Sequence, residues 1–261
     1  MLQYKFQNDL ALYQFNNLSL VKEINHFISG REGGVSEDHT GTLNLSFNVG
    51  DKEENVMENR SRVAAAMNCE PPNLVIPGQT HGNKVGIVDR VKDFPDTDAL
   101  ITNKKGICIA VMSADCVPVL LYDRQNHAVA AVHAGWRGTV GKILSLTLEK
   151  MVSTYGTNPE NVLAGIGPSI CQDVYQVGEE VVERFLKAFG EHKQLIHIDP
   201  ESGKGYPDLW EANKQQLLSL GVPEESIEVA GICTYSNPNM FFSARQSQNK
   251  AGRFAAGIIL R

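Results

Sequence analysis

The sequence predicts one layered α/β domain over residues 1–261, with helices packed outside a central mixed β-sheet. Apolar runs of strand length recur along the chain, and segments with helical periodicity lie between them. The sequence contains no low-complexity stretch, internal repeat or linker rich in Pro, Gly or Ser. A single domain is therefore the expected organisation.

Eight apolar runs have the length of a β-strand. Several of them are continuous rather than alternating, which is typical of strands that are covered on both faces. The expected strands occupy residues 74–76, 85–88, 107–112, 117–122, 128–132, 162–166, 226–232 and 254–260.

Four segments have the periodicity of an amphipathic helix. Asp51 is the expected N-cap of the first helix, which reaches about residue 67. The clearest helix follows Gly138, and its apolar stripe stops near Gly156. Two further helices are expected over residues 179–189 and 208–220.

The composition excludes several classes of protein. With 42% hydrophobic and 21% charged residues the chain is globular, and a net charge of −6 without a Lys/Arg run argues against nucleic acid as a partner. No apolar run approaches the ~18 residues of a membrane span, and no signal peptide is recognisable. Five cysteines, an odd number without a C-x-x-C pair, fit a reducing compartment. We expect a cytoplasmic protein.

Potential metal ligands follow or end three of the expected strands. They are His81, Cys116 and His133, and imidazole nitrogen and thiolate sulfur are ligands that suit zinc. Three protein ligands would leave one coordination position open, as in catalytic zinc sites. The spacing matches no local zinc motif, so the pattern alone leaves a second interpretation open, in which the cysteine is a small buried hydrophobe and each histidine is structural.

A resemblance strengthens the metal interpretation. Eight segments, in order along nearly the whole chain, resemble the purine nucleoside phosphorylase family that was long described as polyphenol oxidases or laccase-domain proteins. They are SGREGGVS at 29–36, QTHG at 79–82, ADCVP at 114–118, AVHAGWRG at 131–138, AGIGP at 164–168, YQVG at 175–178, DLWEAN at 208–213 and FFSAR at 241–245. The resemblance implies a fold distantly similar to that of bacterial toxin deamidases, and a catalytic zinc ion held by His81, Cys116 and His133.

The resemblance also implies an activity on purine nucleosides. Members of the family cleave adenosine, inosine and S-methyl-5′-thioadenosine with phosphate, and they deaminate adenosine. Zinc would activate the water for deamination, and Asp115, or alternatively Asp98, would carry the proton. The expected partners are purine nucleosides and phosphate, with no nucleic acid and no membrane, and the chain is expected to be a monomer or weak homodimer.

Guanidinium groups are the expected phosphate ligands, because their fork grips phosphate oxygens in a bidentate manner. The candidates are Arg31, Arg137 and Arg245, and the alternative for each is a surface ion pair. The family segments favour phosphate binding for Arg31 and Arg245 and leave Arg137 open. Trp136 could stack on a purine or simply cover the core. One departure from the family pattern is Cys171-Gln172, which leaves the shape of that loop open.

Three other functions remain alternatives. In a metal-free cysteine hydrolase or deamidase, Cys116 would be the nucleophile and a histidine its base. A copper-dependent polyphenol oxidase is less compatible with seven histidines and no His-x-His pair, although copper could bind the same three ligands. The third is a zinc-stabilised protein without enzymatic activity, linked to the quality of cell-wall precursors.

Overall fold

The computed structural model describes residues 2–7, 10–190 and 193–261. The longer helices are α2 (Glu53–Ala66), α4 (Ile143–Tyr155), α5 (Glu179–Phe189) and α6 (Leu209–Ser219), and α1 (Asn16–Ser19) and α3 (Trp136–Val140) are short. The strands are β1 (Gln3–Gln7), β2 (Leu10–Gln14), β3 (Ile24–Ser29), β4 (Leu74–Val75), β5 (Val85–Ile87), β6 (Ala99–Thr102), β7 (Cys108–Ser113), β8 (Val117–Asp123), β9 (Ala128–Ala134), β10 (Val162–Ile166), β11 (Ile196–Ile198), β12 (Gly205–Pro207), β13 (Ile227–Val229) and β14 (Phe254–Leu260).

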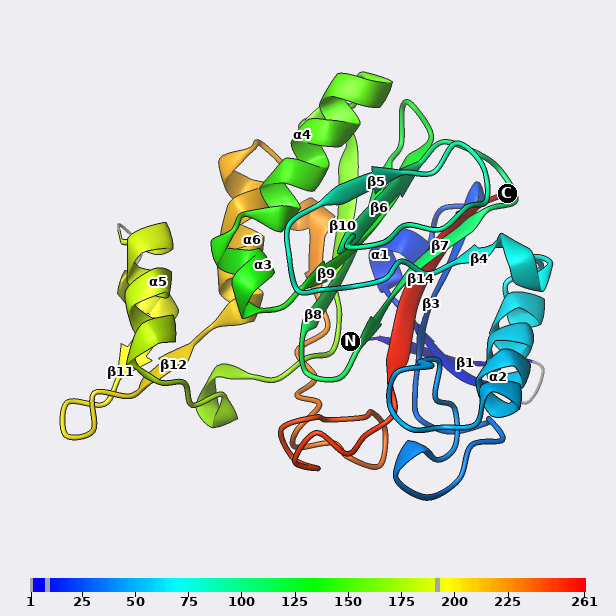
Figure 1. Ribbon diagram of the computed structural model, residues 1–261. Helices are drawn as coiled ribbons and strands as arrows, with labels where there is room; N and C mark the ends of the chain where they lie inside the picture. Colours follow the sequence, from blue (N-terminus) through cyan, green and yellow to red (C-terminus); the bar gives the residue numbers. More distant parts are fainter. Residues whose placement is uncertain (1, 8–9, 191–192) are drawn as a thin grey trace.

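The strands form two six-stranded mixed sheets and a small hairpin. The first sheet has the order β1-β2-β3-β14-β7-β4, and the second has the order β13-β10-β8-β9-β6-β5. Strands β11 and β12 pair separately. Strand β14 pairs with β3 and β7, so the last strand of the chain lies inside the first sheet (Figure 1).

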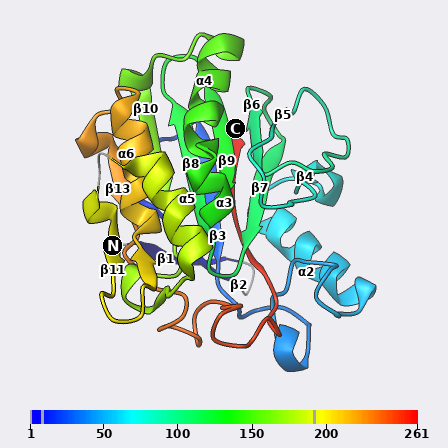
Figure 2. The same ribbon diagram turned by 60° about the vertical axis from the view of Figure 1, so that its left-hand side comes forward.

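Apolar side chains fill three layers around these sheets. One cluster lies between the two sheets and includes Val111, Leu120 and Ile258. A second joins the outer face of the second sheet to α4, α5 and α6, and a third joins the first sheet to α2. Helix α2 therefore lies on the opposite side of the molecule from α3 to α6 (Figures 1 and 2).

The mixed α/β class is confirmed, and what was expected as one central sheet is divided into two. The helix expected after Gly138 is broken at Gly141 and Lys142, where Lys142 has a left-handed φ of 58°. The N-cap of α2 is Lys52 rather than Asp51. The Asp51 carboxylate accepts the backbone N–H of Lys52, the next residue, and so caps no N–H group of the first helical turn. The extent of the domain over residues 1–261 stays a prediction.

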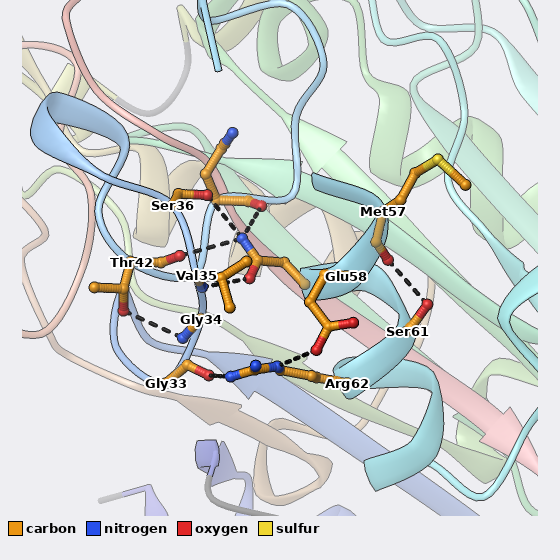
Figure 3. A network of polar contacts seen from close by, with 11 residues as sticks. Gly33, Gly34, Val35, Ser36, Thr42, Met57, Glu58, Ser61 and Arg62 are labelled. Atoms are coloured by element: carbon orange, nitrogen blue, oxygen red, sulfur yellow. Dashed lines mark hydrogen bonds and ion pairs between the residues drawn. The ribbon is translucent and has the colours of Figure 1, made fainter. Parts of the chain in front are cut away.

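The segment that precedes α2 is fastened to this helix by side chains. Asn59, buried in α2, receives the backbone N–H of Val35 and donates to the Ser36 hydroxyl. Arg62 donates to the Gly33 carbonyl and pairs with Glu58 (Figure 3). These bonds fix the chain that leads to Ser46, Asn48 and Val49, which line the cleft described below.

None of the helices in the described part of the chain is both long enough and apolar enough to cross a membrane.

Candidate metal centre and cleft

The fold brings His81, Cys116 and His133 to one point. Cys116 directly precedes β8 and His133 lies near the end of β9, and these strands form an antiparallel hairpin in which Pro118 faces His133. His81 lies in the loop between β4 and β5, with a left-handed φ of 62°. The ligand atoms of the three residues all lie within 4.8 Å of one another. The donor set and this convergence fit a single ion, with His81 exposed and His133 buried.

The buried carboxylate of Asp98 orients two of these side chains, His133 and His81. It accepts the Nδ1–H of His133 at 2.8 Å, which directs Nε2 toward the other ligands. It also accepts the backbone N–H groups of Thr80, His81 and Gly82 at 3.2, 2.9 and 2.8 Å, and so holds the loop that carries His81. The Asp98 carbonyl accepts the His133 backbone N–H at 2.8 Å.

The electrostatics of the centre favour a thiolate. Burial alone would raise the pKa of Cys116, but the two neighbouring histidines, His133 foremost, lower it to about 6. Burial opposes the charge on His133, whereas the Cys116 thiolate and Asp98 raise its pKa to about 9. Asp98 is itself desolvated, and its bonds from His133 and the loop bring its pKa down to about 2. At neutral pH the metal-free centre is thus a thiolate–imidazolium pair.

The backbone at Gly135 packs closely against the candidate ligands Cys116 and His81. A Cβ atom at this position would lie 2.9 Å from the Cys116 sulfur and 3.3 Å from Cδ2 of His81. Only glycine allows the backbone to approach the ligands this closely.

A cleft of about 500 Å³ opens over the three ligands. This volume falls within the usual range for small-molecule sites. Besides the ligands, its lining comprises Ser46, Asn48, Val49, Pro77, Gly78, Gln79, Met112, Ser113, Ala114, Asp115, Trp136, Arg137, Ile170, Tyr175, Ala244, Arg245, Asn249 and Arg253.

The arginines divide between the cleft and the scaffold. Arg137 and Arg245 line the cleft. Arg31 lies outside this lining, because its guanidinium donates to the carbonyls of Gly41 and Pro238 and packs over the Phe242 ring. These contacts fasten loops together and give no support to the phosphate role that the sequence suggested for Arg31.

Asp115 faces the cleft but also holds the C-terminal loop. Its Oδ1 accepts the Thr234 hydroxyl at 2.6 Å, and its Oδ2 accepts the backbone N–H of Arg245 at 2.7 Å. Each oxygen keeps acceptor capacity toward the cleft. Trp136 lines the cleft with the guanidinium of Arg137 4.6 Å from its ring centre, and Arg184 lies 5.8 Å from the same ring.

Several residues of the lining were given no role by reasoning from the sequence, and Arg253 and Tyr175 are two of them. Arg253 precedes β14, and a charged residue at the end of an expected strand is the signal that could have found it. Burial lowers the pKa of its guanidinium. Tyr175 packs beneath Arg245, whose guanidinium lies 5.1 Å from the tyrosine ring centre. Tyr175 belongs to the YQVG segment that carries the family resemblance, but the sequence alone assigned it no role.

Comparisons with known proteins cover nearly the whole chain. The family described as multi-copper polyphenol oxidoreductase laccase matches residues 25–261. A purine nucleoside phosphorylase of Bacteroides thetaiotaomicron is 40% identical over 97% of both chains. Adenosine deaminase RL5, from an unknown prokaryotic organism, is 39% identical over 83% of this chain and 86% of its own. The crystal structure of YlmD from Geobacillus stearothermophilus superimposes with a TM-score of 0.91 at 28% identity, covering 100% of this chain and 98% of its own.

Proposed function

The chain belongs to the multi-copper polyphenol oxidoreductase laccase family, and we propose on that premise that it is a zinc-dependent purine nucleoside phosphorylase that also deaminates adenosine. Its substrates would be adenosine, inosine and S-methyl-5′-thioadenosine. The observation that carries the proposal is the His81–Cys116–His133 cluster at the base of a cleft that is also lined by arginines. The names of the similar proteins, purine nucleoside phosphorylase and adenosine deaminase, support this substrate class.

The donor set supports zinc as the metal. Two imidazoles and one thiolate match zinc's preference for nitrogen and sulfur, and the exposed His81 leaves access to a fourth position. Bound zinc would supply a Lewis acid to the cleft. Among the described residues this is the one group of three or more potential ligands, so we do not propose the several copper ions that the family description suggests.

Phosphate binding falls to the arginines of the cleft. Phosphorolysis passes through a state in which the ribose carbon carries positive charge while phosphate approaches and the base leaves. Arg137 and Arg245 would hold the phosphate and orient it toward that carbon. Arg137 rests on Trp136 and Arg245 on Tyr175, so each guanidinium is restrained before phosphate arrives.

Proton transfer is best assigned to Asp115. Asp98 is committed to four N–H donors, and its pKa of about 2 makes it a poor base at neutral pH. Asp115 lines the cleft beside Cys116 and has acceptor capacity left. The oligomeric state, a monomer or weak homodimer, and the cytoplasmic location stay predictions.

Product analysis with a metal test decides this proposal. Purified protein is incubated with inosine or adenosine, with and without phosphate, and base, ribose 1-phosphate and inosine are separated by chromatography. We expect inosine to be cleaved only with phosphate, and adenosine to give products of both reactions. Cys116→Ala should lose all of them and the control Cys69→Ala none, because Cys69 lies outside the cleft. Absence of any nucleoside turnover by zinc-loaded protein would overturn the proposal.

The thiolate–imidazolium pair favours one rival, a metal-free cysteine hydrolase. Chelation separates the two functions. A zinc enzyme should lose turnover with its metal and regain it on adding zinc, whereas a cysteine hydrolase should keep its activity in the chelator and lose it on alkylation of Cys116. A purely structural zinc would give a protein that chelation destabilises but that turns over no nucleoside at any stage.

A further inference from the structure

Two cysteines, Cys171 and Cys233, lie in contact next to Ile170 of the cleft lining and take part in no step proposed above. Cys171 lies in the segment after β10, and Cys233 lies in the segment after β13. The backbone N–H of Cys171 donates to the sulfur of Cys233 at 3.3 Å. Cys233 is buried and Cys171 is half-buried, so a small reagent has access to the pair from the Cys171 side.

Backbone hydrogen bonds hold the two segments side by side. Ser169 donates its N–H to the carbonyl of Ile232 at 3.2 Å, and Thr234 donates to the carbonyl of Ser169 at 3.1 Å. Ser169 and Cys233 form a parallel β-bridge. The two cysteines are therefore neighbours by construction of the fold, and their contact needs no rearrangement of the chain.

The two thiols also influence each other. Burial and the interaction with Cys233 raise the pKa of Cys171 to about 11. Burial opposes ionisation of Cys233, but hydrogen bonds from Cys171 and Ser236 lower its pKa. The contact thus moves the pKa values of the two thiols apart, upward for Cys171 and downward for Cys233.

The pair is connected to the cleft through its sequence neighbours. Ile170 lines the cleft and donates its N–H to the carbonyl of Asp115 at 3.0 Å. Thr234 donates its hydroxyl to the carboxylate of the same aspartate. Both contacts hold Asp115, which directly precedes the metal ligand Cys116.

We propose that Cys171 and Cys233 are a redox-modified dithiol, which peroxide closes to a disulfide and a low-molecular-weight thiol reopens. On closure the two S–H bonds and the O–O bond of hydrogen peroxide break and one S–S bond forms. The two protons and two electrons pass to the peroxide, which leaves as two water molecules. In reopening, two thiol molecules return the protons and electrons and become their own disulfide.

Closure has a mechanical consequence for the cleft. A disulfide sets its two sulfurs about 2.05 Å apart, closer than two thiols in non-bonded contact. Closure therefore draws the two segments together beyond what side-chain rotation supplies, and this pull passes to the adjacent Ile170 and Thr234. Asp115 is displaced, and nucleoside turnover falls while the zinc ligands stay intact. The effect on turnover rests on the proposed function, whereas the disulfide itself does not.

Disulfide mapping and turnover test the proposal separately. Zinc-loaded protein, in which the metal protects Cys116, is treated with hydrogen peroxide and then digested for mass spectrometry. We expect one peptide pair joined through Cys171 and Cys233, two hydrogens lighter than the free peptides, and a fall in titratable thiols of the denatured protein from five to three. The oxidised protein should lose most of its turnover, and dithiothreitol should restore it.

Matched variants show which cysteines cause the loss of turnover in peroxide. Cys171→Ser should keep its turnover in peroxide, whereas Cys69→Ser, which removes a thiol of the other neighbouring pair, should be inactivated like the natural chain. Absence of the joined peptide, or equal inactivation of Cys171→Ser, would overturn the proposal. A disulfide that forms without changing turnover would overturn its link to the cleft. If no nucleoside turns over at all, the proposed function fails, and the peptide map still decides the dithiol.

Discussion

Replacing Gly135 with alanine tests whether the three ligands bind one ion in the arrangement described. The added Cβ would lie 2.9 Å from the Cys116 sulfur, where ordinary contacts begin at 3.4 Å. The sulfur must therefore move away by about half an ångström. Functional side chains have to stay within about 0.5 Å of their productive positions, so this shift uses up the permitted deviation. A free thiol absorbs such a shift by rotating, but a metal ligand must stay near about 2.3 Å from zinc.

The expected result is a protein that folds but binds zinc weakly. Changes around metal ligands commonly weaken metal affinity by about 10- to 100-fold, which corresponds to about 1.4–2.8 kcal/mol. Gly178→Ala is a matched control, because both glycines are helix N-caps with similar backbones, φ/ψ −68°/172° and −81°/174°, and a Cβ on Gly178 meets nothing within 4 Å. In each variant the altered helix cap should lower the free energy of unfolding by about 1 kcal/mol or less.

Competition with a chromophoric zinc chelator measures the affinity, and thermal unfolding of the metal-free proteins measures the fold. The difference between the two variants isolates the contact with the ligands. If Gly135→Ala and Gly178→Ala bound zinc equally well, the three side chains would not share an ion in this geometry, and the proposed function would lose its foundation.

Three further outcomes follow from the same centre. Asp98→Asn should weaken zinc binding by about 10- to 100-fold in the chelator competition. In the variant the amide NH₂ would face N–H donors that bind the carboxylate in the natural chain. Unchanged affinity would contradict the role of Asp98 in orienting the ligands. Between pH of about 6 and about 9 the metal-free centre holds a Cys116 thiolate and a protonated His133, so zinc binding should release a proton from His133, and below pH of about 6 a further proton from Cys116, as measured by calorimetry in buffers of different ionisation enthalpy. Arg245→Gln should raise KM for phosphate several-fold while Arg31→Gln leaves it unchanged and lowers the unfolding temperature; the reverse pattern would return the phosphate role to Arg31.

The strands that the sequence predicted best are those with uninterrupted apolar runs. Strands β8, β9 and β14 are buried along their whole length, and composition alone marks them. Strand β3 is equally buried but was missed, because Asn25 and His26 interrupt its apolar pattern. The fold satisfies these polar groups from distant segments, for example through the Phe15 N–H that donates to Nε2 of His26 at 2.8 Å. Such partners are invisible to a local pattern.

The functional residues show the same division between local and distant information. Local apolar runs placed Cys116 and His133 next to strand ends, and the family resemblance grouped them with His81. In the structure the β8–β9 hairpin brings Cys116 and His133 together. The placement of Arg31 could not be foreseen, since its guanidinium donates to carbonyls that lie 10 and 207 residues after it in the sequence. The Gly-rich turn around Arg31 suggested an anion site. In the structure its guanidinium instead joins the loops that contain Gly41 and Pro238.

The two buried aspartates near the centre lie in different environments, and the different roles proposed for them rest on that difference. Asp98 is surrounded by N–H donors, so its charge is stabilised and its pKa falls to about 2, which makes it a fixed acceptor that aims His133 and the His81 loop. Asp115 receives one donor on each oxygen and borders the cleft. A carboxylate that holds ligands must not change its protonation state, whereas one that carries protons must be able to reach the substrate. The sequence offered both residues for the second task, and the hydrogen-bond pattern separates them.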